Sequence, residues 1–236
     1  MALEAVDSQT SSGSVIETGI ESDPETGSES GAEVRSGAGD VIAYTLHGNC
    51  YLNLTSRCTL RCEFCPKFNK NWEVQGYPLR LRQGPTVQQM LAAVGDPSAY
   101  REVVFCGLGE PTLRLQELLQ VAHSLKQAGA RVRLNTDGLA NWVYQRNIVP
   151  ELAECVDALS ISLNAQDETT YNRHCRPPAV GAYPELLEFI LCAREHISDI
   201  TITAIDGLEG VDIGACESLA QRFDVKFRRR VLDDVG

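Results

Sequence analysis

From residue 41 onward, short runs typical of β-strands alternate along the chain with segments of helical periodicity. Six β-branched or alternating runs predict strands, at residues 50–55, 102–106, 130–134, 156–163, 200–205 and 225–228. Four segments with apolar residues on one face predict helices, at residues 86–94, 115–128, 184–196 and 214–223. Because strands joined by a helix form right-handed crossovers, this alternation predicts a mostly parallel sheet.

The number of strands narrows the choice within the α/β class. A closed barrel of this kind uses eight strands, so six strands predict a partial, open (β/α)6 TIM-like barrel. A doubly wound open sheet is the alternative. In both architectures, ligands bind at the carboxyl ends of the parallel strands.

The first forty residues differ from the rest in charge and in composition. Nine acidic residues and one basic residue, Arg35, give residues 1–40 a net charge of −8, and they contain no Phe, Tyr or Trp. Such a segment cannot bury enough apolar surface to offset its conformational entropy. We expect a disordered acidic tail over residues 1–40, which either solubilises the chain or binds a regulatory partner, and one folded domain over residues 41–236.

Charge and hydropathy exclude several function classes. The net charge of −11 argues against an electrostatic nucleic-acid binder, which needs a large basic face. No apolar run approaches 18 residues, and no basic stretch followed by an apolar one opens the chain. We therefore expect a soluble cytoplasmic protein that binds neither nucleic acid nor membrane.

Three of the nine cysteines, Cys58, Cys62 and Cys65, directly follow the first predicted strand. Soft thiolates select zinc, Cu(I) or iron–sulfur clusters. A structural zinc site needs a fourth protein ligand, and the remaining cysteines and the four histidines are scattered along the chain. Three thiolates would leave a coordination position open on an iron–sulfur cluster, although zinc remains an alternative.

The spacing of these cysteines, with Phe64 before the last, resembles the signature of the radical S-adenosylmethionine (SAM) superfamily. Residues 105–112 resemble that superfamily's Gly-Gly-Glu-Pro segment, with Leu108 in place of the first glycine. Residues 134–138 and 160–165 resemble its segments after the third and fourth strands, with Asn164 where Asp is common. More narrowly, residues 46–55, 101–115 and 134–141 resemble the TatD-linked branch.

This resemblance implies the partial β/α barrel and two cofactors. Cys58, Cys62 and Cys65 would hold one [4Fe–4S] cluster, and SAM would bind at its open iron. Glu110 would pair with the methionine ammonium of SAM. The other residues that the resemblance implies for SAM are Phe64, Gly107, Gly109, Asn135, Ser162 and Asn164.

The resemblance implies an enzyme that cleaves SAM to a 5′-deoxyadenosyl radical, which abstracts hydrogen from an unidentified small-molecule or protein substrate. It also implies a low-potential electron donor such as flavodoxin or ferredoxin. An activating enzyme for a partner protein and a redox-sensing iron–sulfur module are alternatives. His174, Cys175 and one of Arg228–Arg230 are further candidates for substrate contact, whereas we expect Cys106, Cys155, Cys192 and Cys216 to be buried.

Overall fold

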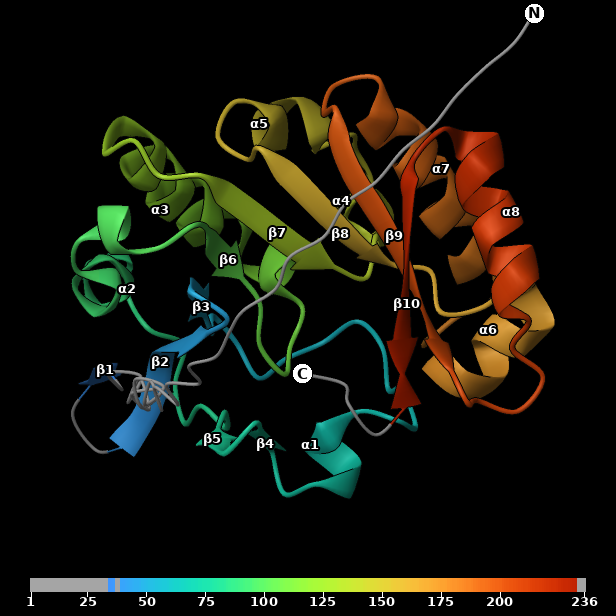
Figure 1. Ribbon diagram of the computed structural model, residues 1–236, viewed down its shortest axis with the longest axis horizontal. Coiled ribbons are helices and arrows are strands. Elements are labelled where there is room, and N and C mark those ends of the chain that lie inside the picture. Colours follow the sequence, from blue (N-terminus) through green and yellow to red (C-terminus); the bar gives the residue numbers. More distant parts are fainter. Residues whose placement is uncertain (1–33, 37–38, 233–236) are drawn as a thin grey trace, which may run out of the picture. The chain divides into compact units, whose positions relative to one another are not determined.

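The computed structural model describes residues 34–36 and 39–232 (Figure 1). Its main sheet has eight strands in the order β1-β2-β3-β6-β7-β8-β9-β10. The strands are β1 (Val34–Ser36), β2 (Asp40–Leu46), β3 (Asn49–Leu52), β6 (Val103–Phe105), β7 (Val132–Thr136), β8 (Ala158–Ser162), β9 (Asp199–Asp206) and β10 (Lys226–Val231). Strands β4 (Glu73–Val74) and β5 (Tyr77–Pro78) form a separate hairpin.

The six predicted strands are confirmed, and they are parallel to one another. Strands β3, β6, β7, β8, β9 and β10 pair in this order, each parallel to the next. Their carboxyl ends therefore meet at one edge of the sheet. The fold is α/β with a mostly parallel sheet. The sheet is open, because β1 and β10 stand at its two ends and do not pair with each other.

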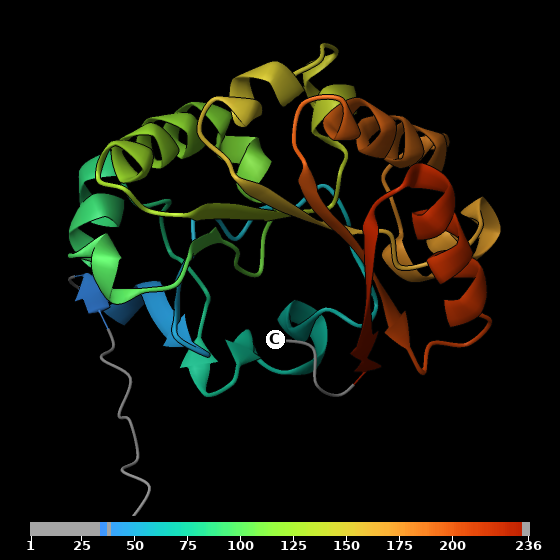
Figure 2. The same cartoon turned by 45° about the horizontal axis from the view of Figure 1, so that its top comes forward.

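Helices cover the convex face of this curved sheet, and no long helix among residues 39–232 covers the concave face (Figure 2). This placement differs from a doubly wound sheet, which has helices on both faces. The helices are α1 (Pro66–Asn69), α2 (Val87–Val94), α3 (Leu115–Gln127), α4 (Ala140–Tyr144), α5 (Val149–Ala153), α6 (Glu168–Cys175), α7 (Ala182–Arg194) and α8 (Ile213–Phe223), with 3-10 turns η2 (Pro97–Ala99) and η3 (Pro111–Arg114). None of the helices in the described part of the chain is long and apolar enough to cross a bilayer.

Several elements were not predicted. Strand β2 begins at Asp40 and pairs antiparallel with both β1 and β3, so four residues of the expected tail, Val34–Ser36 and Asp40, belong to the sheet. Apart from Gly39, the rest of the predicted tail lies outside the described residues. Helices α1, α4 and α5 have four or five residues each, too few to show a helical period. Helix α6 is polar along most of its length.

Alternation along the strands separates an apolar outer face from a polar inner face. Phe105, Leu134, Ile161 and Ile202 are fully buried and belong to the main hydrophobic cluster. Between them, inner-face positions carry polar side chains, such as Asn135, Ser160, Ser162, Thr203 and Arg228. The convex side of the sheet thus supplies the core, and the concave side is available for ligand chemistry.

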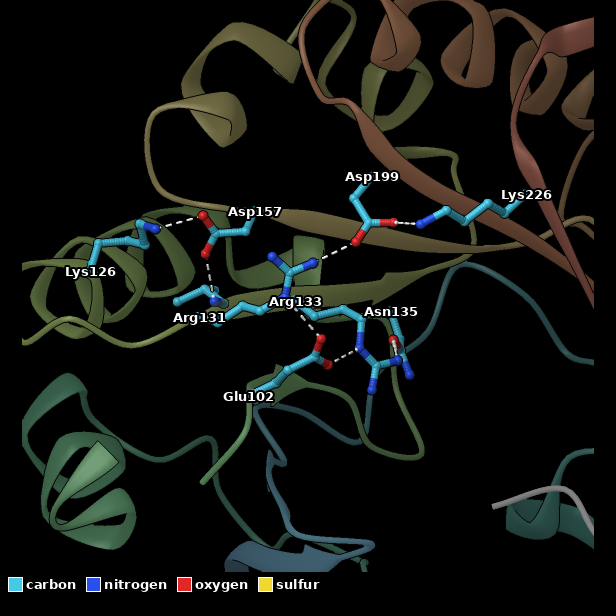
Figure 3. Close-up of polar contacts among 9 residues, drawn as sticks. Glu102, Lys126, Arg131, Arg133, Asn135, Asp157, Asp199 and Lys226 are labelled. Atoms are coloured by element: carbon cyan, nitrogen blue, oxygen red, sulfur yellow. Dashed lines mark hydrogen bonds and ion pairs between the residues drawn. The ribbon is translucent and has the colours of Figure 1, made fainter. Parts of the chain in front are cut away.

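A network of ion pairs joins the amino ends of these strands (Figure 3). Arg131, directly before β7, pairs with Glu102 before β6 and with Asp199 at the start of β9. Lys226, which begins β10, pairs with Asp199 at 2.8 Å. Asp157, directly before β8, accepts from the Lys126 ammonium at 2.6 Å and from the Val132 amide at 2.8 Å. This network joins the amino ends of the strands, at the opposite end of the sheet from their carboxyl ends, where ligands bind in such folds.

We expect Asp157→Asn to lower the free energy of unfolding by about 1 kcal/mol, because it weakens a half-buried charge-assisted contact between α3 and the sheet. The matched control is Asp224→Asn, whose carboxylate is 84% exposed and 3.8 Å from Arg194; it should change stability by less than about 0.5 kcal/mol. Urea unfolding of both variants measures the difference. Equal losses would show that the network contributes nothing specific.

Candidate functional site

A cavity of about 230 Å³ opens at the carboxyl ends of the parallel strands. Its wall comes from the cysteine loop after β3 and from the ends of β6, β7, β8, β9 and β10. The structure brings all ten residues predicted from the sequence to this cavity: Cys58, Cys62, Phe64, Cys65, Gly107, Gly109, Glu110, Asn135, Ser162 and Asn164. Phe64 is half-buried and also packs against the main hydrophobic cluster.

The three thiols come from one loop, which runs from Cys58 to Cys65. Cys58 is exposed, and Cys62 and Cys65 are half-buried. Within residues 39–232, no three His, Cys, Asp or Glu side chains converge closely enough to hold a single ion, so the thiols lie along the cavity wall. The donor set nevertheless fits an iron–sulfur cluster, because three soft ligands face one space and no fourth cysteine lies on the loop.

Helix α6 anchors the cysteine loop. The amides of Arg61 and Glu63 donate to the carbonyls of Cys175 and His174, at 3.1 and 2.9 Å. The Glu63 carboxylate binds the buried His174 ring and accepts from Arg176 at 2.8 Å, and its hydrogen bond with His174 is the largest cause that lowers the pKa of Glu63. His174 and Cys175, both candidates for substrate contact, are instead buried and hold the loop.

The Gly-Leu-Gly-Glu loop after β6 packs closely against the start of the cysteine loop. A Cβ on Gly109 would lie 2.2 Å from the Thr55 carbonyl oxygen, so only glycine fits there. The Glu110 amide donates to the Arg57 carbonyl at 2.8 Å. We expected the glycines to admit a ligand, but at Gly109 the close approach is to the chain's own backbone. Leu108, which departs from the family pattern, packs with Tyr44 in a second hydrophobic cluster.

The carboxylate of Glu110 is buried, and four hydrogen bonds from the protein hold it. Its Oε1 accepts from the Thr112 amide, the Thr112 hydroxyl and the Thr136 hydroxyl, at 3.1, 2.7 and 2.8 Å. Its Oε2 accepts from the Asp137 amide at 2.8 Å. Glu110 therefore joins the ends of β6 and β7, and it supports the fold as well as facing the cavity.

A second buried carboxylate, Asp137, faces the same cavity and was not among the predicted site residues. Its Oδ1 accepts from the Leu139 amide at 3.0 Å, whereas its buried Oδ2 accepts no hydrogen bond among the described residues. Burial and the nearby charge of Glu110 raise the pKa of Asp137 well above its ordinary value, and burial also raises the pKa of Glu110. The Thr59 hydroxyl, also buried without a hydrogen bond among the described residues, acts on the Asp137 carboxyl to lower its pKa. The sequence feature that could have indicated Asp137 is its position directly after a parallel strand, two residues beyond Asn135.

The polar residues at the strand ends are already oriented by neighbours. Asn135 Oδ1 accepts from Arg133 Nη1 at 3.0 Å (Figure 3). Asn164 has a positive φ of 61°, a conformation that Asn adopts more readily than most residues. Its Oδ1 accepts from Arg230 at 2.8 Å, and its Nδ2 donates to the Cys175 sulfur at 3.5 Å. The positive φ thus explains why Asn, rather than most other residues, is suited to position 164.

The cavity contains one cysteine that we expected to be buried among apolar residues. Cys106 is half-buried and lines the cavity, because it follows β6 at an inward-facing position, two residues after Val104. Cys155 and Cys216 are buried, as expected, and Cys192 is half-buried against the main cluster. The prediction that Cys106 is buried among apolar residues was therefore wrong, because Cys106 lines the cavity.

Residues 52–223 match the profile of the Radical SAM superfamily. The chain therefore belongs to the radical SAM superfamily, whose family cofactors are a [4Fe–4S] cluster and SAM. The matched residues begin in β3 and end in α8, so they contain the cysteine loop and the ends of β6 to β9.

Two curated relatives are similar to parts of this chain. The "Probable dual-specificity RNA methyltransferase RlmN" of Deinococcus deserti is 32% identical over 149 residues, 59% of this chain and 40% of that protein. The "Tungsten-containing aldehyde ferredoxin oxidoreductase cofactor-modifying protein" of Pyrococcus furiosus is 29% identical over 48% of this chain and 30% of that protein. The aligned regions thus span less than half of the length of either relative.

A solved structure supports the fold. SuiB of Streptococcus suis, bound to S-adenosylmethionine, superposes with a TM-score of 0.58 at 13% identity and covers 81% of this chain and 42% of that one. At this identity, the similarity concerns the fold alone.

We expect Asp137→Asn to stabilise the SAM-free full chain at pH 7 by about 1–3 kcal/mol, because it removes a buried carboxyl group whose ionisation is disfavoured and whose Oδ2 accepts no hydrogen bond among the described residues. The folded protein holds the Asp137 proton to higher pH than the unfolded chain does. Wild-type stability therefore falls as pH rises above the ordinary Asp value of about 4, and the variant lacks this fall.

Urea unfolding of wild type and Asp137→Asn at pH 4 and pH 7 measures this difference. The stabilisation should be present at pH 7 and nearly absent at pH 4. The variant Asp157→Asn is the control, because its carboxylate has two partners and its loss destabilises. A loss of stability in Asp137→Asn at pH 7 would contradict the assignment of an unpaired buried charge.

Proposed function

We propose that Cys58, Cys62 and Cys65 hold one [4Fe–4S] cluster, and that the chain cleaves SAM in the adjoining cavity. The observation that supports this proposal most is that the three thiols line the same space as the buried Glu110–Asp137 pair and the polar strand ends. A structural zinc site would need no such polar wall. A redox-sensing cluster would not need it either.

When bound and reduced, the cluster supplies one electron that cleaves a carbon–sulfur bond of SAM and yields methionine and a 5′-deoxyadenosyl radical. The residues of this chain bind and orient SAM. Glu110 and Asp137 provide carboxyl groups for the methionine ammonium, whose positive charge would favour their ionised forms, and among the described residues the buried Asp137 Oδ2 accepts no hydrogen bond. Ser162 and Asn135 line the same wall and offer hydrogen bonds, and Phe64 offers an apolar surface to the adenine.

The substrate would lie across the open mouth of the sheet, opposite the cysteine loop. We interpret the six parallel strands with helices on the convex face as a partial (β/α)6 barrel, whose wide mouth admits a small molecule or a protein segment. The stretches 46–55, 101–115 and 134–141 favour the TatD-linked branch of the superfamily. That finer assignment rests on sequence resemblance.

The proposal includes a low-potential electron donor, such as flavodoxin or ferredoxin, and a reducing, cytoplasmic setting. All nine cysteines are free thiols, which agrees with a compartment where disulfides are rare. An exposed Cys58 near the surface favours access of a donor protein to the cluster.

Anaerobic reconstitution with iron and sulfide tests the cysteine assignment. Wild type should contain about four irons per chain, as one [4Fe–4S] cluster does, and the full chain, once reduced and given SAM, should release 5′-deoxyadenosine without a partner protein. Cys58→Ala, Cys62→Ala and Cys65→Ala should each lose the cluster and this release. Cys192→Ala is the matched control, because Cys192 lies outside the cavity, and it should keep both.

Iron content near eight per chain, or stoichiometric zinc without iron, would contradict the proposal. Release of 5′-deoxyadenosine only after addition of a second protein would instead favour the activating-enzyme alternative.

SAM binding provides a second, independent prediction. Asp137→Asn should weaken SAM binding by roughly 10- to 150-fold, since a hydrogen bond to a charged group contributes about 1.5–3 kcal/mol. The same change should raise stability without SAM, so binding and folding move in opposite directions. Ser162→Ala should weaken binding by roughly fivefold, the loss of one neutral hydrogen bond.

Titration of SAM into anaerobic, cluster-loaded protein measures these affinities. Asp157→Asn is the control, because Asp157 lies at the amino ends of the strands, away from the cavity, and this variant should bind SAM as wild type does. Glu110→Gln is unsuitable for this purpose, because the Glu110 carboxylate accepts four hydrogen bonds that support the fold. Equal affinities of wild type and Asp137→Asn would remove Asp137 from the SAM site.

A further inference from the structure

Strand β10 carries three consecutive arginines, and two of them face the cavity. Arg228 and Arg230 line it, because residues two apart on a strand share a face. Arg229, between them, points to the other side and pairs with Asp206. The same strand thus presents two arginines to the site and one outside it.

Within the described part of the chain, the two inward arginines have no carboxylate partners. Arg230 Nη2 donates to Asn164 Oδ1 at 2.8 Å, and Arg228 Nη2 lies 3.4 Å from Ser160 Oγ. Across residues 39–232, neither guanidinium forms an ion pair with a carboxylate, and Arg230 Nε is buried without any partner. By contrast, Arg133 on the same concave face pairs with Glu102 at 2.7 Å.

This arrangement is costly in the absence of an anion. Burial lowers the pKa of Arg230 to about 10, and the neighbouring charge of Arg228 acts in the same direction. A charged side chain with buried polar atoms normally has a counterion or a complete set of hydrogen bonds. An anion between the two guanidiniums would supply an acceptor for Arg230 Nε and offset the repulsion between them.

We propose that Arg228 and Arg230 bind an anionic group of the substrate, a carboxylate or a phosphate. Guanidinium groups match the geometry of both anions with paired N–H donors. The inference rests on the proposed function, in which the cysteine loop and the Glu110–Asp137 pair receive the cluster and SAM in the same cavity. The arginines on β10 then orient the substrate, whereas the two acids come from the ends of β6 and β7.

The carboxylate of SAM has the same chemistry, so the experiment must separate the two sources. Inorganic phosphate and acetate are titrated by calorimetry into the anaerobic, cluster-loaded full chain, at constant ionic strength, with and without saturating SAM. Wild type should bind at least one of the two probes saturably under both conditions. Arg228→Gln and Arg230→Gln should each weaken this binding about tenfold or more, with cluster content unchanged.

Arg229→Gln is the matched control, because it removes the same charge from the same strand but on the other face; its affinity should stay within about twofold of wild type. Wild type that binds neither probe saturably, unchanged binding in Arg228→Gln and Arg230→Gln, or an equal loss in Arg229→Gln would overturn the proposal. Competition between the probes and SAM would assign the arginines to the SAM carboxylate and would also overturn it. Arginine-dependent binding in a protein that cannot cleave SAM would support the anion site and contradict the proposed function.

Discussion

The buried residue Glu110 joins three of the segments that form the cavity wall. Its two oxygens accept from Thr112, Thr136 and Asp137, and so connect the end of β6 with the end of β7. Its own amide donates to the Arg57 carbonyl at the start of the cysteine loop. Glu110 therefore helps to set the position of the thiols relative to the polar strand ends, together with the contacts between α6 and the cysteine loop. Among the described residues, no hydrogen bond reaches Oδ2 of its neighbour Asp137.

The cavity separates charges of opposite sign. The acids Glu110 and Asp137 come from the ends of β6 and β7, and the arginines Arg228 and Arg230 come from the far edge strand β10. A sheet that is parallel from β3 to β10 produces this separation directly, because each strand delivers its last inward-facing side chains to the same edge. At the amino ends of the strands, by contrast, acidic and basic side chains pair with one another in the network around Arg131 (Figure 3).

Patterns with a clear period predicted the parallel strands and the long helices, whereas the residues that line the cavity were implied by the resemblance of short motifs to the radical SAM superfamily. What failed depended on tertiary contacts. The buried Asp137 and the inward-facing Cys106 were missed because period-two alternation shows which residues share a face, but not which face meets the site. Gly109 is explained by the Thr55 carbonyl, a contact between separate segments that no local pattern contains. Short helices such as α4 fall below the length at which a period shows.

The measurement that tests the central claim most directly is electron paramagnetic resonance of the anaerobic, dithionite-reduced full chain before and after SAM is added. If Cys58, Cys62 and Cys65 hold a cluster with an open iron beside the cavity, a single reduced [4Fe–4S] signal should appear, and SAM should change it. The signal should be absent in Cys62→Ala. A cluster signal that SAM leaves unchanged, or one that survives the loss of Cys62, would contradict the account.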